Sequence, residues 1–197
     1  MPVQPGDVEA RTLRRGRQLE VLTLGWNLVG VAILAFAAIG AKSVALAGFG
    51  LDSVIEIGAS TVVLWELADV AQARQRTALR LIGSAFLTLA IYLGVQSTLV
   101  LVIGFRPHHS PIGIVWTAMT AIAMFALASG KARVGAALDN PVLRAEGRVT
   151  MIDGILATAV LSGLVLNTFA GWWWADPVTG YVILYYALRE ARGTLKS

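Results

Sequence analysis

Six long apolar stretches dominate the sequence, and each is close to the length that a helix needs to cross a lipid bilayer. A helix rises 1.5 Å per residue, so about 20 residues span the roughly 30 Å hydrocarbon core. The stretches cover residues 19–40, 43–67, 79–104, 111–129, 149–170 and 172–188. Only 14% of the chain is charged, whereas a soluble domain has about 25% charged residues. We therefore expect an all-α polytopic membrane protein with six transmembrane helices.

Basic residues are distributed unevenly along the chain, and their positions predict the orientation of the helices. Short cytoplasmic loops of membrane proteins are enriched in Lys and Arg. If the N-terminus is cytoplasmic, 14 of the 16 Lys and Arg residues fall inside, and Lys42 and Arg106 fall outside. We expect both termini in the cytoplasm, with a basic segment at 1–18, a six-helix domain at 19–190 and a tail at 191–197. This bias explains the net charge of +4 without nucleic acid and suits a bacterial inner membrane.

Two local signals predict where helices stop and start. Asp139-Asn140-Pro141 indicates a turn within the segment 130–148, which we expect outside the membrane on the cytoplasmic side, with helix resuming after the proline. Asp176-Pro177 is typical of a helix start, with Asp176 as the N-cap residue and Pro177 at the first helical position. A role of Asp176 in ion entry is the alternative.

Three acidic residues lie inside predicted spans: Asp52 and Glu56 in the second, and Asp153 in the fifth. A charge at the bilayer centre costs about 2.5–3.5 kcal/mol, so these side chains should face the protein interior. No Lys or Arg is expected near the middle of a span, so a buried salt bridge lacks its positive half. The carboxyl groups are then either protonated or bound to a divalent cation, and a site that exchanges protons for metal uses both states. A protonated, inert cluster is the alternative.

The predicted depths of the carboxyl groups do not agree. Counted from the ends of the spans, Asp153 lies nearer the cytoplasm than Asp52 by about two turns at 1.5 Å per residue. Helix tilt or a longer fifth helix would bring them to the same level.

Three segments resemble one transporter family. Residues 43–60, with Asp52 and Glu56 four positions apart, resemble the second transmembrane helix of the cation diffusion facilitator (cation efflux) family. Residues 144–154 are similar to the family's fifth helix, and Trp173-Trp174-Ala175-Asp176-Pro177 together with residues 187–191 is similar to its sixth. The resemblance implies a six-helix exporter, usually a homodimer, that moves divalent metal out of the cytoplasm in exchange for protons.

The resemblance also implies the metal ligands. Asp52, Glu56 and Asp153 match the family's ligand positions, whereas Val149 stands where a His or Asp is common. Water, Thr150 or Asn27 could fill the fourth position. Oxygen ligands favour harder ions such as Mn²⁺ over Zn²⁺, although carboxylates also bind Zn²⁺. Zn²⁺, Mn²⁺ and Fe²⁺ therefore stay open as the transported ion, and we expect no cofactor.

A further implication concerns assembly. The chain resembles a short form of the family that lacks the C-terminal cytoplasmic domain, so we expect a homodimer to form through the membrane helices. The absence of cysteine excludes thiolate metal sites.

Several polar residues leave alternatives open. Glu146, a weaker ligand candidate, and Glu190 are predicted near the cytoplasmic mouth, where they could attract cations or pair with neighbouring arginines. His108 and His109 form an outer loop that could capture metal or be solvated, and Gln96 could bond across helices.

Enzyme motifs are absent, so we expect a transporter and not an enzyme. Lipid or peptide hydrolysis based on Asp52 and Asp153 is one alternative. A non-transporting membrane regulatory or assembly protein of the same fold is the other.

Overall fold

The computed structural model describes residues 5–66, 72–139 and 141–195, and these fold into six α-helices without a strand. The helices are α1 (Pro5–Ala41), α2 (Val44–Glu66), α3 (Gln72–Ile103), α4 (Pro111–Ala137), α5 (Pro141–Ala170) and α6 (Ala175–Leu195). Four of them, α1, α3, α4 and α5, are long and apolar enough to cross a membrane. The predicted all-α architecture is therefore confirmed, and four of the six described helices meet the criterion for a membrane span.

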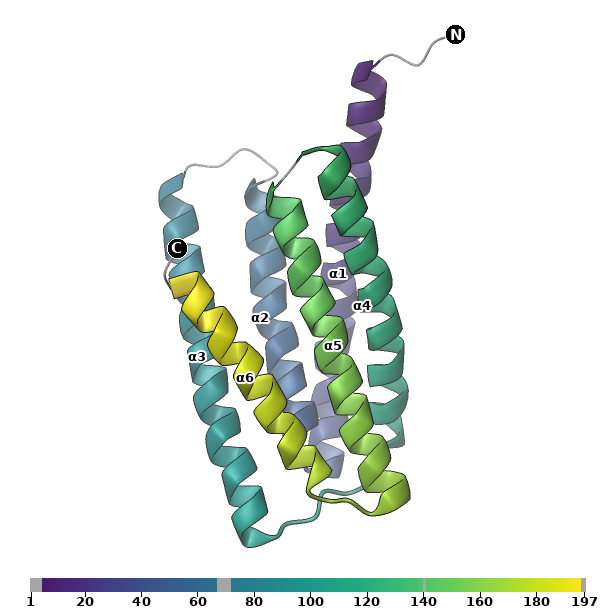
Figure 1. Cartoon of the computed structure of the whole chain (residues 1–197), viewed down its shortest axis with the longest axis vertical. Helices are drawn as coiled ribbons and strands as arrows, with labels where there is room; N and C mark the ends of the chain where they lie inside the picture. Colours follow the sequence, from purple (N-terminus) through teal and green to yellow (C-terminus); the bar gives the residue numbers. More distant parts are fainter. Residues whose placement is uncertain (1–4, 67–71, 140, 196–197) are drawn as a thin grey trace.

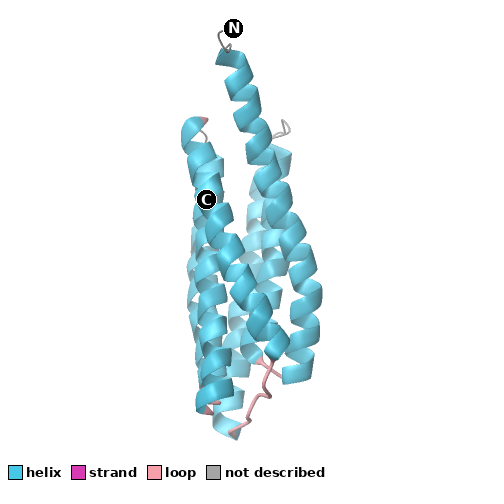
Figure 2. Cartoon of the chain, turned by 90° about the vertical axis from the view of Figure 1, so that its right-hand side faces the viewer, coloured by secondary structure: helices cyan, strands magenta, loops and turns pink. Residues whose placement is uncertain are grey.

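The helices form one up-and-down bundle (Figure 1). The most extensive contacts pair α4 with α5, α3 with α6 and α1 with α2. Helices α1, α2, α5 and α4 follow one another around a four-helix core, and the α3–α6 pair packs against α2 and α5. A view from the side shows α1 extending beyond its neighbours at one end (Figure 2).

Two ends of the bundle need names. The terminal end is where α1, α3 and α5 begin and where α2, α4 and α6 end (Figure 1). The hairpin end holds the connections at 42–43, 104–110 and 171–174. Gly104 (φ 70°) and Gly171 (φ 68°) adopt the left-handed conformation there, which glycine accepts without strain.

Side chains are distributed as expected for a protein in lipid. Large apolar groups such as Phe36 (70% exposed), Ile122 (74%) and Phe169 (81%) point outward. Nineteen polar or charged residues are instead buried in the described part of the bundle. Since an unsatisfied polar group is costly in hydrocarbon, each of these needs a partner inside the protein.

The structure extends α4 and α5 into the predicted connector 130–148. Helix α4 continues to Ala137 and α5 begins at Pro141, so apart from a short turn the described part of this segment is helical. The turn itself is confirmed: Asp139 has φ 49°, and helix resumes at Pro141, while Asn140 lies outside the described residues. Apolar stretches mark the lipid-facing part of a helix, but backbone hydrogen bonding carries the helix further.

Asp176 does not cap its own helix, so the prediction of an N-cap was wrong. It lies within the first turn of α6, fully buried, and its carboxylate binds the start of α2. Oδ2 accepts from the backbone N–H of Val44 (3.0 Å) and of Ala45 (3.4 Å), and the Ser43 hydroxyl donates to Oδ1. The first N–H groups of a helix have no intrahelical acceptor, and the carboxylate of a distant helix supplies one.

Lys131 is also buried, contrary to the prediction that it lies in a cytoplasmic loop. Its ammonium Nζ donates to Glu20 Oε2 (3.0 Å), Glu146 Oε1 (3.3 Å) and Thr150 Oγ1 (3.1 Å), and Ser60 Oγ donates to the same Glu146 oxygen (3.4 Å). We call Glu20, Lys131, Glu146 and Thr150 the lysine cluster. It joins α1, α4 and α5 on the terminal side of the bundle, and Ser60 adds α2.

Replacing Asp176 by Ala should weaken the bundle. The variant leaves the N–H groups of Val44 and Ala45 and the Ser43 hydroxyl without their acceptor, at a cost of about 1–3 kcal/mol. Denaturant unfolding of the purified protein in detergent, followed by circular dichroism, measures this. Asp139→Asn removes the charge of an exposed carboxylate paired with Arg144, and it is the control because Asn tolerates the positive φ at this position. An equal effect of the two substitutions would contradict the capping role.

Replacing Lys131 by Met should destabilise the protein more strongly. Two buried glutamates lose their positive partner, and removal of one member of a buried ion pair costs about 3–5 kcal/mol. Adding Glu20→Gln and Glu146→Gln to the same chain should restore much of this loss, because no uncompensated charge remains. The same unfolding measurement applies, with Arg133→Met on the exposed face of α4 as the control. A triple variant as unstable as the single one would argue against charge compensation.

Candidate metal centre

Asp52 and Glu56 project from one face of α2 because residues four apart on a helix lie one above the other. Both side chains are 5% exposed. Leu51, directly before Asp52, is 44% exposed and Val54, between the two acidic residues, is 48% exposed, so these two side chains point outward. The pair therefore faces the interior of the bundle, as predicted.

Asp153 of α5 is the second part of the site. It is 2% exposed, and neither carboxylate oxygen accepts a hydrogen bond from any described residue. Such a buried oxygen is costly unless a proton or a cation compensates it. Among the described side chains, Asp153 is the carboxylate of which both oxygens are buried without a hydrogen-bond donor.

One cavity of about 20 Å³ brings the three carboxyl groups together. Asp52 and Glu56 line it from α2 and Asp153 from α5, and the remaining lining residues come from α3, α5 and α6: Phe86, Val149, Ile152, Leu156, Tyr186, Ala187 and Glu190. Roughly 10–15 Å³ is enough for one water molecule. The cavity thus has room for a single small species.

The length of α5 resolves the predicted mismatch in depth. The helix begins at Pro141 and not at Val149, so Asp153 lies well inside it. Because α2 and α5 run in opposite directions, Glu56 and Asp153 then lie at similar distances from the terminal end.

The three carboxyl groups are not close enough to one another to bind a single ion in the present side-chain conformations. Among the described residues, no group of three or more His, Asp or Glu side chains is close enough to hold a metal ion as it stands. The three carboxyl groups line the same small cavity, so a cation there could be bound only after side-chain rotation.

The three weaker candidates do not line the cavity. Asn27 is 2% exposed, and its Nδ2 donates to Glu56 Oε2 at 2.9 Å, so its amide holds Glu56 from α1. Thr150 and Glu146 belong to the lysine cluster, and Lys131 is the ion-pair partner of Glu146 in place of the arginine that we expected. Glu190, predicted near the cytoplasmic mouth, lines the cavity.

The sequence contained signals for Lys131 and Glu190 that we did not use. The buried residues Thr117, Met124, Ala128 and Lys131 of α4 follow helical spacing, so its inward face continues through Lys131. Glu190 follows Tyr186 by four residues and lies on the same face of α6. In both cases the residue is charged and was therefore expected to be exposed, although its spacing matches the buried face of its helix.

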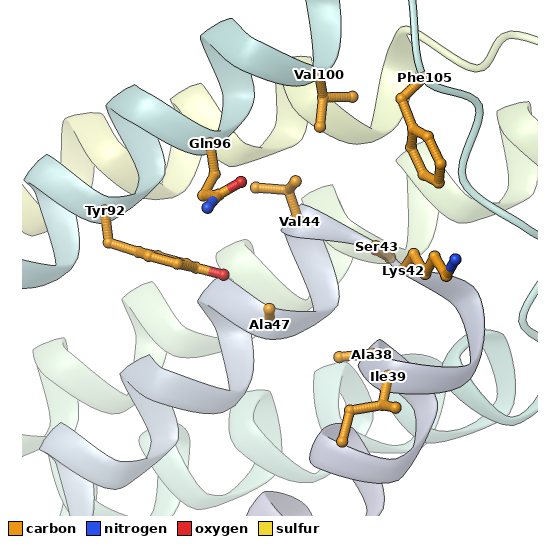
Figure 3. A pocket seen from close by; sticks show the side chains of 10 residues that line it. All are labelled: Ala38, Ile39, Lys42, Ser43, Val44, Ala47, Tyr92, Gln96, Val100 and Phe105. Carbon is orange, nitrogen blue, oxygen red and sulfur yellow. The ribbon is translucent and has the colours of Figure 1, made fainter. Parts of the chain in front are cut away.

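Polar residues at the hairpin end do not join this site. His108 and His109 are exposed in the loop before α4. Gln96 lines a separate pocket of about 390 Å³ together with Lys42 and Tyr92 (Figure 3). The carboxylate cavity is therefore the place in the described structure where predicted ligands meet.

Comparison with known proteins identifies the family. The model of the cation efflux transmembrane domain matches residues 77–197, which include most of α3 and all the described parts of α4 to α6. The match contains Asp153 and Glu190 but not the α2 pair. No curated protein matches the chain. Since the matched segment is more than half of the sequence, the chain belongs to the cation efflux family, whose members transport metal cations.

Proposed function

We propose that this protein is a divalent metal cation exporter that binds its cargo at Asp52, Glu56 and Asp153 and exchanges it for protons. The observation that carries the proposal is Asp153, buried and without a hydrogen-bond partner among the described residues, on the same small cavity as Asp52 and Glu56.

Charge compensation supports both halves of the exchange. Three carboxyl groups in a low-dielectric bundle repel one another when ionised, so the empty cavity favours bound protons. A divalent cation removes this repulsion and favours the ionised groups instead. Metal entry therefore releases protons, and proton entry releases metal.

The neighbouring polar groups support this assignment because they are already engaged. Lys131 is the buried cation nearest to the site along α4 and α5, but its ammonium contacts Glu20, Glu146 and Thr150. Asn27 of α1 donates an N–H to the Glu56 carboxylate of α2 and so can hold this carboxylate toward α1. Neither group donates a hydrogen bond to Asp153.

The ligand chemistry favours a hard or borderline ion. The three groups offer oxygen atoms only, and the chain has no cysteine. Carboxylates suit Mn²⁺ and also bind Fe²⁺ and Zn²⁺. We therefore place Mn²⁺ first among the candidate cargoes.

The orientation follows from the basic residues. In the structure the terminal end receives the helix ends that carry the excess of Lys and Arg, whereas Lys42 and Arg106 belong to the hairpin end. We propose six spans with the terminal end in the cytoplasm of a bacterial inner membrane. We also propose that two copies associate through lipid-facing helix surfaces, as the family resemblance implies.

Loss of a cavity carboxylate should abolish transport. In inside-out vesicles with an imposed pH gradient, the wild-type protein should accumulate Mn²⁺, and a protonophore should reduce the uptake. Asp52→Ala and Asp153→Asn should each lower the initial rate by at least about tenfold, because even outer-shell changes cost about 10- to 100-fold in metal affinity.

Asp139→Asn, which changes an exposed carboxylate, is the matched control and should transport normally. Equal uptake by all variants would refute the proposed site. A wild-type protein that binds Mn²⁺ but moves none under the gradient would favour a regulatory role.

Cysteine labelling should test the orientation, because the natural chain contains no cysteine. His109→Cys, exposed at the hairpin end, should react with a membrane-impermeant maleimide in intact cells. Ala136→Cys, exposed near the end of α4, should react only after permeabilisation. The reverse pattern would invert the proposed topology.

A further inference from the structure

We infer that Glu190 of α6 is the fourth ligand of the cation site, in place of the side chain that Val149 cannot supply. This inference rests on the proposed function and deepens it. The cavity joins Glu190 with Asp52, Glu56 and Asp153, so that three helices and not two contribute carboxylates.

Among the described residues of the cavity wall, Glu190 is the one further carboxylate besides the three proposed ligands. The other lining side chains are aliphatic or aromatic, and of these only Tyr186 carries an oxygen, which is a neutral hydroxyl. Val149 lies in the same wall, on the turn of α5 that precedes Asp153. A ligand missing from α5 can therefore be replaced from α6 across the same cavity.

The position of Glu190 on α6 allows this role. Ile183, Ala187 and Ala191 are buried against the bundle, and Glu190 lies at the edge of this face, half-buried. Its carboxylate is close enough to Asp52 for their charges to interact. A long, half-buried side chain at this edge can reach the cavity and also meet water near the terminal end.

Asp153 supplies independent evidence that a ligand belongs here. Its two buried oxygens line the cavity without a donor from the described residues. A buried carboxylate without a hydrogen-bond donor requires a proton or a cation, and a divalent cation bound at Asp153 would lie within reach of the other carboxylates on the same cavity. Glu190 thus adds an oxygen ligand where an imidazole is absent, which further favours Mn²⁺ over Zn²⁺.

Titration of the purified protein in detergent with Mn²⁺ alone, followed by calorimetry, tests the inference. Glu190→Gln should weaken Mn²⁺ binding by at least about tenfold, comparable with the usual cost of disturbing a metal site. Asp139→Asn is the control for loss of an exposed carboxylate. Adding Val149→His to Glu190→Gln should restore tight binding and shift the preference toward Zn²⁺, because it returns a ligand to the same cavity.

The outcomes separate the inference from the proposed function. If Glu190→Gln binds Mn²⁺ like the wild type while Asp153→Asn does not, Glu190 is no ligand and the three-carboxylate site stands. If the wild-type protein binds none of Mn²⁺, Fe²⁺ and Zn²⁺, each titrated in the same way, both are wrong. Should Glu190→Gln fail to fold, Glu190→Asp shortens the side chain but keeps its charge, and we expect weaker binding; unchanged binding would overturn the inference.

Discussion

The dominant constraint on this protein is the need to compensate every buried charge from within a bundle that faces hydrocarbon. Water is absent from the bilayer core, so a carboxylate or ammonium group there must find its partner on another helix. Most of the buried charges described here do so. The paired charges show which helices are joined to each other and at which end of the bundle.

Two paired clusters hold opposite ends of the bundle. At the hairpin end, Asp176 of α6 binds the first N–H groups of α2. On the terminal side, Lys131 of α4 joins Glu20 of α1 with Glu146 of α5. Helices α2, α5 and α6, which carry the cavity carboxylates, are thus each joined to a neighbouring helix by a charged side chain.

Between these clusters lie Asp52, Glu56 and Asp153, and no ion pair is found between any of them and a described residue. Asn27 donates to Glu56, but Asp153 accepts nothing from the described residues. An exporter needs this contrast, because a permanently paired carboxylate cannot exchange its partner. In the proposed mechanism the paired clusters stay in place while the cavity carboxylates exchange protons for a metal ion.

The family match and the lining of the cavity indicate the same class of protein. They depend on different parts of the chain. The family match begins at residue 77 and so rests on α3 to α6. The α2 pair enters through the geometry, which places Asp52 and Glu56 opposite Asp153. The proposed site therefore combines residues from inside and outside the matched segment.

The sequence by itself determined the membrane character, the helices and the three central carboxylates, because apolar length and isolated charges are properties that single segments carry. It did not determine the partners of those charges. Lys131 was predicted in a loop, Asp176 on its own helix and Glu190 at the mouth, because composition reports the polarity of a segment and not which helix lies opposite. Only the tertiary structure brought Lys131 to Glu20, Asp176 to Val44 and Glu190 to the cavity. The physical reason is that compensation of a buried charge is a contact between helices distant in sequence, decided when the bundle packs.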